Sequence, residues 1–210
     1  MGLAFDFFAG TGSSTQALED RGWKVIRFEL DRSFDADVHE DVLELDVPFL
    51  LGAFGRPDFV WASPPCTSFS IAAMGHHWDN RLTNPTPKTE TAKLGIKMVS
   101  HTVRLIAGLQ PRQGWLMENP RGMLRKMDAV KGLPMSTISY CQYGDFRMKP
   151  TDVWGGINGW LPSKMCKNNS SCHEAAPRGA NSGTQGMRNA KEKSVVPYGL
   201  SFEIADKLKA

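Results

Sequence analysis

The hydrophobic positions of the chain fall into two recurring patterns. Apolar residues recur at helical spacing over residues 90–109, and a start rich in serine and threonine predicts a shorter helix over residues 13–21. Short apolar runs bounded by glycine, proline or charged residues predict strands over residues 3–8, 23–29, 42–45, 58–63 and 114–118. Strands and helices therefore alternate, which predicts an α/β fold with a doubly wound, mostly parallel sheet.

The pattern changes after residue 121. Residues 136–142 and 152–154 read as two strands joined by a tight loop, and we expect them to form an antiparallel edge of the sheet. Residues 155–194 show no clear period and are rich in Gly, Asn, Ser and Lys, whereas residues 198–208 predict a final helix. A chain of 210 residues fits one domain, so we expect a single domain over residues 1–210 with a small insertion at 155–194.

Composition narrows the class of protein. Hydrophobic residues make up 41% of the chain and charged residues 22%, which excludes a disordered protein. The apolar runs are far shorter than the roughly 20 residues of a membrane-spanning helix, and the start of the chain has no export-signal pattern. We therefore expect a cytoplasmic protein without a membrane partner, whose four cysteines are thiols or metal ligands rather than disulfides. No pattern indicates an obligate protein partner.

The net charge of +3 conceals a strong asymmetry along the chain. Residues 1–60 contain five Lys and Arg against twelve Asp and Glu, whereas residues 61–210 contain twenty against ten. A basic portion of this size is typical of proteins that bind a polyanion, although basic surfaces also serve solubility alone. The balance favours nucleic acid as a partner.

A glycine turn connects the first predicted strand to the first predicted helix. Its sequence, Phe8-Ala9-Gly10-Thr11-Gly12, lets the backbone approach a ligand closely, although a plain tight turn is an equally open reading. Glu29 ends the next strand, where a carboxylate can bind ribose hydroxyls, and Asp41 could hydrogen-bond an adenine amino group. An acidic edge favours an adenosyl ligand without phosphates. For Asp41, an ordinary loop carboxylate remains an alternative.

Two further strands end in residues that can carry chemistry. Ser63-Pro64-Pro65-Cys66 follows the strand at 58–63, and two prolines hold the cysteine at the edge where parallel sheets place their ligands. Glu118-Asn119 ends the strand at 114–118, where the glutamate could act as a general acid or bind a base edge. A small buried thiol and a salt-bridging acid are the structural alternatives, but the rigid loop favours a nucleophile at Cys66.

The chain resembles the DNA (cytosine-5) methyltransferases in four features that occur in this order: the glycine turn, the acids Glu29 and Asp41, the loop with Cys66, and Glu118-Asn119. The resemblance implies a Rossmann-like fold that binds S-adenosyl-L-methionine through the glycine loop, with Glu29 at the ribose and Asp41 at the adenine. It implies that Cys66 is the nucleophile and that Glu118 binds the cytosine. Pro64 and Val196 fall at further cofactor-binding positions of the family.

The later motifs depart from the family pattern. Pro120 stands where the family usually has valine, and the segment 143–149 keeps only basic character, which leaves Arg147 and Lys149 as the matches to its two arginines. Val196-Pro197 resembles the closing cofactor motif, but its usual Gly-Asn pair is replaced by Lys193-Ser194. Only about forty residues remain for target recognition. Short forms of this kind are similar to phage-borne members.

The resemblance also implies a mechanism on double-stranded DNA. A cytosine flipped out of the duplex would be attacked at C6 by Cys66, held at N3 and its amino group by Glu118, and methylated at C5. Arg147 would hold the base carbonyl or a nearby phosphate. Further substrate or DNA contacts are expected at Pro65, Ser68, Asn119, Arg121, Lys149 and Lys164.

Three alternatives remain open from the sequence. The chain could be a degenerate methyltransferase fold that binds DNA or cofactor without turnover, or an enzyme acting on a free pyrimidine nucleotide. The ammonium group of Lys193 could instead select a carboxylated form of S-adenosylmethionine as donor.

Cys141, Cys166, Cys172 and His173 could hold a metal, but their spacing matches no familiar zinc motif, so we expect free thiols and no metal.

Overall fold

The computed structural model describes residues 1–79, 84–163, 165–168, 170–174 and 189–209. Its main sheet has six strands in the order β2-β1-β3-β6-β8-β7. The pairs β1·β2, β1·β3 and β3·β6 are parallel, whereas β8 runs antiparallel to both β6 and β7. The strands are β1 (Leu3–Phe7), β2 (Lys24–Phe28), β3 (Phe59–Ala62), β6 (Gly114–Pro120), β7 (Met135–Ser139) and β8 (Pro150–Ile157). The predicted parallel sheet with an antiparallel edge is confirmed.

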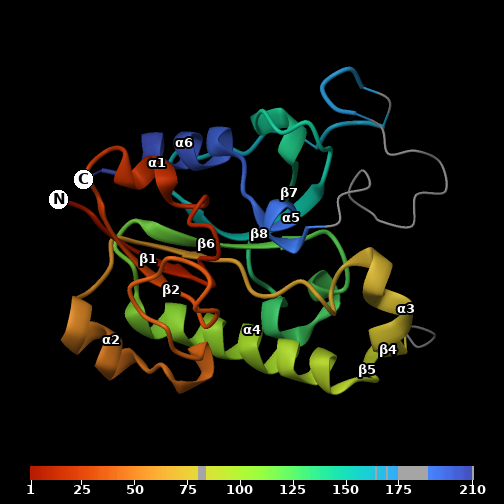
Figure 1. Ribbon diagram of the computed structural model, residues 1–210, viewed down its shortest axis with the longest axis horizontal. Helices are drawn as coiled ribbons and strands as arrows, with labels where there is room; N and C mark the ends of the chain where they lie inside the picture. The colour runs from red at the N-terminus through yellow and green to blue at the C-terminus, as the bar shows by residue number, and fades with distance from the viewer. Residues whose placement is uncertain (80–83, 164, 169, 175–188, 210) are drawn as a thin grey trace.

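Helices cover both faces of this sheet (Figure 1). α2 (Val47–Phe54) and α4 (Glu90–Leu109) lie on one face, and α1 (Gln16–Glu19) and α6 (Tyr198–Lys207) lie on the other. The shorter elements are α3 (Met74–His77), α5 (Ala190–Ser194), the hairpin of β4 (Trp78–Asp79) and β5 (Thr86–Pro87), and the 3₁₀ helices η1 (Val42–Glu44), η2 (Ile71–Ala73), η3 (Leu124–Lys126), η4 (Asp128–Val130) and η5 (Tyr140–Tyr143).

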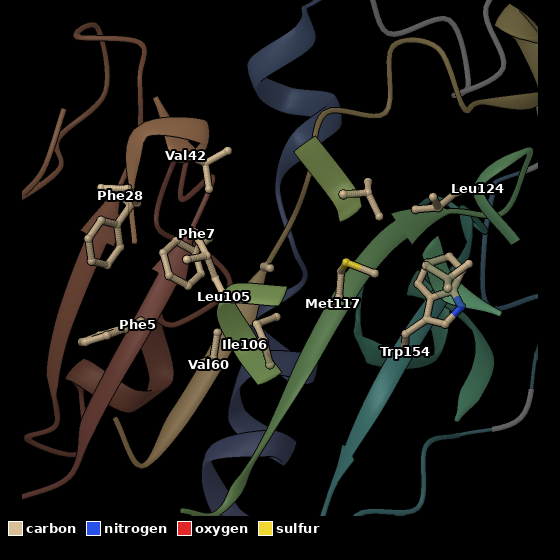
Figure 2. Close-up of a cluster of buried hydrophobic side chains, with 14 of the residues drawn as sticks. Phe5, Phe7, Phe28, Val42, Val60, Leu105, Ile106, Met117, Leu124 and Trp154 are labelled. Carbon is tan, nitrogen blue, oxygen red and sulfur yellow. The ribbon is translucent and has the colours of Figure 1, made fainter. Parts of the chain in front are cut away.

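The central strands are buried on both faces. Phe5 and Phe7 of β1 point toward α2 and α4 and pack on Phe28, with ring centroids 5.4 and 4.8 Å from it (Figure 2). Their neighbour Ala4 and the β3 residue Trp61 belong to the cluster on the opposite face. This two-sided burial explains why the strands read as continuous apolar runs rather than as alternating ones.

Two expectations about local structure were wrong, and both involve aspartate caps. Residues 42–45 do not form a strand, because the Asp41 carboxylate accepts a hydrogen bond from the Leu43 amide at 3.0 Å and starts η1. The helix α2 was not anticipated at all. It begins where the Asp46 side chain accepts a bond from the Phe49 amide at 2.8 Å. Local side-chain bonds of this kind override a short apolar run.

Other boundaries shift without changing the topology. The first helix, expected over residues 13–21, is limited to four residues in α1. The strand expected at 136–142 ends at Ser139 and continues as η5, and the strand expected at 152–154 extends over all eight residues of β8. Within the described residues, no helix combines the length and the apolar character needed to cross a membrane.

Candidate active site

A cavity of about 790 Å³ opens at the carboxyl ends of β1, β3 and β6. Its lining brings together many residues singled out in the sequence: Phe8, Ala9, Gly10, Thr11, Pro64, Pro65, Cys66, Glu118, Arg121, Lys149, Lys193 and Val196. A smaller cavity of about 260 Å³ is lined by Glu29 and Asp41 and shares Phe8 and Pro65 with the larger one. Most of the predicted cofactor and catalytic residues therefore lie around two adjoining cavities at one edge of the sheet, whereas Gly12 and Arg147 line neither.

The glycine loop needs glycine at specific places. Gly10 and Gly12 have φ of +51° and +70°, which side-chain-bearing residues rarely adopt. A Cβ at Gly12 would lie 2.7 Å from the guanidinium of Arg27, whereas a Cβ at Gly10 would meet nothing within 4 Å. Gly12 is thus favoured by its positive φ, and a side chain there would also displace Arg27, whereas Gly10 leaves its side of the loop open to a ligand.

A buried aspartate anchors the loop from below. Asp6 of β1 is fully buried, and its Oδ2 accepts hydrogen bonds from Ser14 at 2.6 Å and Thr15 at 2.8 Å. Burial raises the pKa of Asp6 to about 6, although these two hydroxyls oppose the shift. The residues that fix the loop are therefore Asp6, Ser14 and Thr15, which sequence reasoning did not single out.

Glu29 connects the end of β2 to the glycine loop. Its Oε2 accepts a hydrogen bond from the Gly10 amide at 3.0 Å, and its Oε1 accepts one from the Asp31 amide at 3.0 Å. The walls of the smaller cavity are apolar at Phe28, Val42 and Met98. An apolar slot with a carboxylate edge suits an adenine ring and ribose hydroxyls, and it would repel phosphates.

The loop that carries Cys66 is fixed by hydrogen bonds to backbone carbonyls. The Ser63 amide donates to the Phe7 carbonyl at 3.0 Å, and Asn119 Nδ2 donates to the Pro64 carbonyl at 2.8 Å. The Cys66 carbonyl accepts from the amides of Phe69 and Ser70 at 3.0 and 3.1 Å. Asn119 is buried, so its role here is to hold the loop after β3 against the end of β6.

Cys66 is exposed at the surface of the cavity, and neighbouring protein groups partly desolvate its thiol. This partial desolvation, together with the negative charge of Glu118, raises the pKa of Cys66. The positive charges of Lys149 and Lys193 oppose that rise. The thiolate, which is the reactive form, is therefore controlled by three charged groups that line the same cavity.

Glu118 is held in place by a tyrosine that sequence analysis missed. The buried Tyr140 hydroxyl donates a hydrogen bond to Glu118 Oε1 at 2.9 Å. Burial, followed by the charge of Glu118, raises the pKa of Tyr140 well above its usual range. Lys149 Nζ lies 4.4 Å from the centre of the Tyr140 ring, and burial lowers the pKa of Lys149. No sequence motif marks Tyr140, because its contact with Glu118 depends on the pairing of β7 and β8 with β6.

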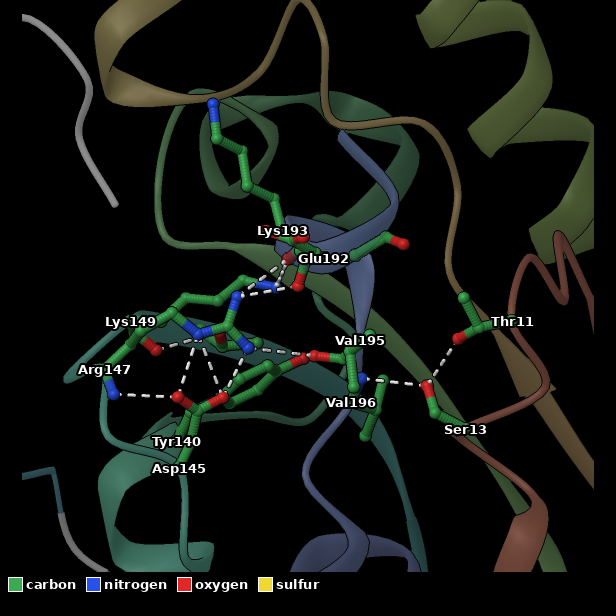
Figure 3. Close-up of polar contacts among 12 residues, drawn as sticks. Thr11, Ser13, Tyr140, Asp145, Arg147, Lys149, Glu192, Lys193, Val195 and Val196 are labelled. Atoms are coloured by element: carbon green, nitrogen blue, oxygen red, sulfur yellow. Dashed lines mark hydrogen bonds and ion pairs between the residues drawn. The ribbon is translucent and has the colours of Figure 1, made fainter. Parts of the chain in front are cut away.

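Arg147 does not belong to the described residues that line the cavity. Its guanidinium forms an ion pair with Asp145 and donates to the carbonyls of Glu192, Lys193 and Val195 at 3.1–3.3 Å (Figure 3). Lys149 Nζ donates to the same Lys193 carbonyl at 2.9 Å. Arg147 is thus placed to hold the segment around α5 rather than to point into the cavity.

The same segment is joined to the glycine loop. The Val196 amide donates to Ser13 Oγ at 2.9 Å, and Thr11 donates to that hydroxyl at 3.0 Å (Figure 3). Ser13 was expected only as part of a helix start. The side of the cavity that is predicted to bind the cofactor is therefore closed by Ser13 and Val196, which lie near opposite ends of the sequence.

The residues predicted to contact DNA include both exposed and buried ones. Pro65 and Arg121 are exposed at the cavity, and Arg121 Nη1 lies 3.6 Å from the sulfur of Met165. Ser68 is buried, and its carbonyl accepts a bond from the Trp78 indole at 2.7 Å, so it belongs to the support of the loop. Lys164 lies outside the described residues.

Comparison with known proteins identifies a relative in sequence. The chain is 33% identical over 172 residues to a probable DNA (cytosine-5)-methyltransferase of Frog virus 3, covering 80% of this chain and 76% of that protein. No family model matches the sequence.

Solved structures show a similar fold. The Entamoeba histolytica methyltransferase EhMeth superposes with a TM-score of 0.56 at 12% identity, covering 80% of this chain and 57% of the other. A mutant DNMT2 of Spodoptera frugiperda gives a TM-score of 0.49 at 12% identity over 78% and 53%. The chain spans little more than half the length of these structures.

The fold defines a Rossmann-like α/β protein whose sheet resembles that of a solved methyltransferase. Its sequence relationship to the viral protein is more specific. The chain belongs to the DNA (cytosine-5)-methyltransferase family.

Proposed function

We propose that this protein transfers a methyl group from S-adenosyl-L-methionine to C5 of cytosine in double-stranded DNA. The observation that carries the proposal is the lining of one cavity by Cys66, Glu118 and the glycine loop. A thiol that can add to a pyrimidine ring, a carboxylate that can bind its edge and a loop for an adenosyl ligand are thereby within reach of one another. We further propose that the protein acts in the cytoplasm, on nucleoid DNA or on viral DNA in a host.

The residues present fit the proposed cofactor. Glu29 would bind the ribose hydroxyls, Asp41 the adenine amino group, and the open side of Gly10 the remaining chain of the ligand. Val196 and Pro64 would close the cavity around it. When bound, S-adenosylmethionine supplies the electrophilic methyl group that C5 of the activated cytosine accepts.

The catalytic steps on the base follow from Cys66 and Glu118. The Cys66 thiolate would add to C6 of the flipped cytosine while Glu118 shares a proton with N3 and accepts a hydrogen bond from the exocyclic amino group. Because the charge of Glu118 raises the pKa of Cys66 in the free protein, engaging that carboxylate with the base would favour the thiolate. Loss of the C5 proton then expels the thiolate and restores the aromatic ring.

The basic residues divide into two roles. Lys149 would complement the negative charge that develops near Glu118, because both line the cavity. Arg147 would act as a positioning residue that fixes the carbonyls of the α5 segment. Arg121 is exposed at the rim and would contact a DNA phosphate, as would Lys164 if the duplex reaches that segment. We propose that residues 155–194 form a reduced target-recognition region.

Trapping with 5-fluorocytosine tests this proposal. A duplex that contains the base, incubated with the protein and S-adenosylmethionine, should give a covalent adduct on Cys66 that survives denaturation, because fluorine at C5 prevents release of the thiolate. A degenerate binding protein would shift the duplex without an adduct. An enzyme for free nucleotides would form an adduct only with the nucleotide, and either result would refute DNA methylation.

One observation favours a second candidate, in which the donor carries a carboxylate. Lys193 lines the cavity, and its charge is close enough to Cys66 to lower the pKa of the thiol. A carboxylated S-adenosylmethionine would place its negative charge near that ammonium group. Mass spectrometry of nucleosides from DNA modified in cells decides between the donors: methylcytosine alone, with Lys193→Ala unaltered in product, excludes the charged donor.

A further inference from the structure

Three of the four cysteines meet one histidine at a single point outside the cavity. The donor atoms of Cys141, Cys166, Cys172 and His173 all lie within 4.8 Å of one another. Cys172 Sγ is 3.2 Å from Cys166 Sγ and 3.7 Å from Cys141 Sγ. His173 Nδ1 is 3.6 Å from the sulfurs of both Cys166 and Cys172. Among the described residues, this group of thiols and imidazole is the one with a metal-ligand composition.

The separations of 3.6–3.7 Å lie close to those of a tetrahedral zinc site, and the 3.2 Å between Cys166 and Cys172 is shorter. With Zn–S bonds of about 2.3 Å and a Zn–N bond of about 2.0 Å, tetrahedral geometry puts neighbouring sulfurs ~3.8 Å apart and sulfur and nitrogen ~3.5 Å apart. A disulfide requires about 2.05 Å between sulfurs, well below the distances found. We propose that Cys141, Cys166, Cys172 and His173 bind one Zn²⁺, with the protons of the thiols released to solvent on binding.

The surroundings of the ligands support a closed structural site. Cys141 and Cys166 are buried, and the Gln142 amide nitrogen lies 3.4 Å from Cys172 Sγ and 3.8 Å from Cys141 Sγ, where it can donate to thiolate sulfur. Cys172 is exposed and provides a path for the metal to enter. With four protein ligands no position is open for substrate, so the metal stabilises structure and takes no part in methyl transfer.

The site ties a poorly packed segment to the sheet. Polar contacts already attach this segment: the Cys166 amide donates to Ser139 Oγ at 3.0 Å, and the Glu174 amide donates to the Phe146 carbonyl at 2.9 Å. Cys141 comes from η5, which follows β7 directly. The zinc would replace the hydrophobic core that the segment lacks, as structural metals do in small loop-rich regions.

The cluster is also connected to the Glu118 carboxylate through Tyr140. Cys141 follows Tyr140, whose hydroxyl donates to Glu118. Loss of the metal would therefore loosen the support of Glu118 as well as the recognition segment. This consequence rests on the proposed function, whereas metal binding itself does not, so a failure of one can be distinguished from a failure of the other.

Metal content is the direct test. We expect the full-length protein, purified from zinc-supplemented cells without chelators, to contain one zinc per chain by elemental analysis. Cys172→Ser and His173→Ala should lose most of it. Cys66→Ser is the matched control, because it removes the one cysteine outside the cluster and should keep the metal.

Cobalt substitution and thiol counting keep the proposal falsifiable if a ligand variant misfolds. Wild-type protein loaded with Co²⁺ should show the intense visible absorption of tetrahedral cobalt with thiolate ligands, and Cys66→Ser should show it too. With zinc bound, Cys66 alone should react quickly with a thiol reagent, and all four cysteines should react after denaturation with a chelator. Protein without stoichiometric zinc or the cobalt spectrum, or with only two thiols after denaturation, would overturn the proposal.

Discussion

The central strands of the first half, residues 1–120, and the loops of the second half, residues 121–209, are stabilised in different ways, although both halves contribute to the two hydrophobic clusters. In residues 1–120 the central strands β1 and β3 are buried on both faces by aromatic and aliphatic side chains, as the Phe5, Phe7 and Phe28 cluster shows. In residues 121–209 the loops beyond the sheet depend on directional contacts, such as Arg147 with three carbonyls. The first half supplies the thiol and the glycine loop, and the second supplies Lys149, Lys193 and Val196.

This difference indicates which half of the molecule should tolerate substitutions. Hydrophobic burial is non-directional and spread over many contacts, so single substitutions at the cavity edge of the first half should leave its fold intact. A directional polar contact fails when one partner is lost, because the other remains buried without compensation. Single substitutions should therefore destabilise the loops of the second half more than the central strands of the first. The following predictions are designed to distinguish the two halves.

The largest effect is expected from removing the nucleophile of the first half. Cys66→Ser should lower methyl transfer by about 10⁴-fold or more, because a serine hydroxyl is a far weaker nucleophile at neutral pH. The free energy of unfolding and cofactor affinity should stay near wild type, since the Cys66 side chain faces the cavity. Transfer of labelled methyl groups and calorimetric titration of the cofactor measure these outcomes. Turnover retained in the variant would end the thiolate mechanism.

The next largest effect is expected from a substitution that destabilises the second half. Arg147→Ala leaves the Asp145 carboxylate without its ion-pair partner. It also removes one donor from each of the carbonyls of Glu192, Lys193 and Val195, of which that of Lys193 keeps a bond from Lys149. Removing one partner of a buried pair typically costs about 3–5 kcal/mol. Hydrogen exchange should show the loss around residues 192–196, while β1 and β3 remain protected.

A conservative substitution provides the control for Arg147. Arg147→Lys keeps the charge but not the planar fork that serves Asp145 and three carbonyls, so only part of the stability should return. If Arg147 instead contacted the base, both variants would fold with normal hydrogen exchange and lose only affinity for cytosine. That result would contradict its role as a positioning residue.

The contrast between the halves also explains which secondary-structure elements could be predicted from the sequence. Strands β1, β2, β3 and β6 and the helix α4 were predicted within one or two residues at most ends, because each is a contiguous apolar run or a long periodic segment. The element at 42–45 and the helix α2 were not, because aspartate caps rather than periodicity determine them. In the second half, the position of η5 depends on pairing between distant strands.

The candidate site follows the same division. Cys66, Glu118 and Glu29 could be placed from the sequence, because each ends a parallel strand and such ends meet at one edge. The environments of Arg147 and Tyr140 could not, because Glu118 and the carbonyls that Arg147 binds lie more than twenty residues from them in the sequence. Ser68 shows a further limit: it neighbours the nucleophile motif in sequence, yet its position is buried.

A smaller effect tests the polar contact buried in the first half. The pKa of Asp6 is raised from 3.8 to about 6, so the folded protein binds this proton more tightly than the unfolded chain does. Stability from this group is full below about pH 4 and is lost as the pH rises to about 6, a loss of about 3 kcal/mol at most. Asp6→Asn cannot titrate, so the difference in unfolding free energy between the two proteins should change by that amount across this range. Parallel pH curves would refute the assignment.

The smallest expected effect concerns the contact that joins the two halves at the catalytic carboxylate. Tyr140→Phe removes one hydrogen bond to Glu118 and keeps the ring that packs beneath Lys149. A hydrogen bond to a charged group is worth about 1.5–3 kcal/mol, and part of this should return because Glu118 faces the cavity and can be hydrated. We expect the rate of methyl transfer to fall about tenfold, which corresponds to about 1.4 kcal/mol, with cofactor affinity unchanged. Single-turnover kinetics on DNA separate this from a defect in binding. If cofactor affinity fell and the single-turnover rate did not, Tyr140 would support the fold of the cavity rather than the orientation of Glu118.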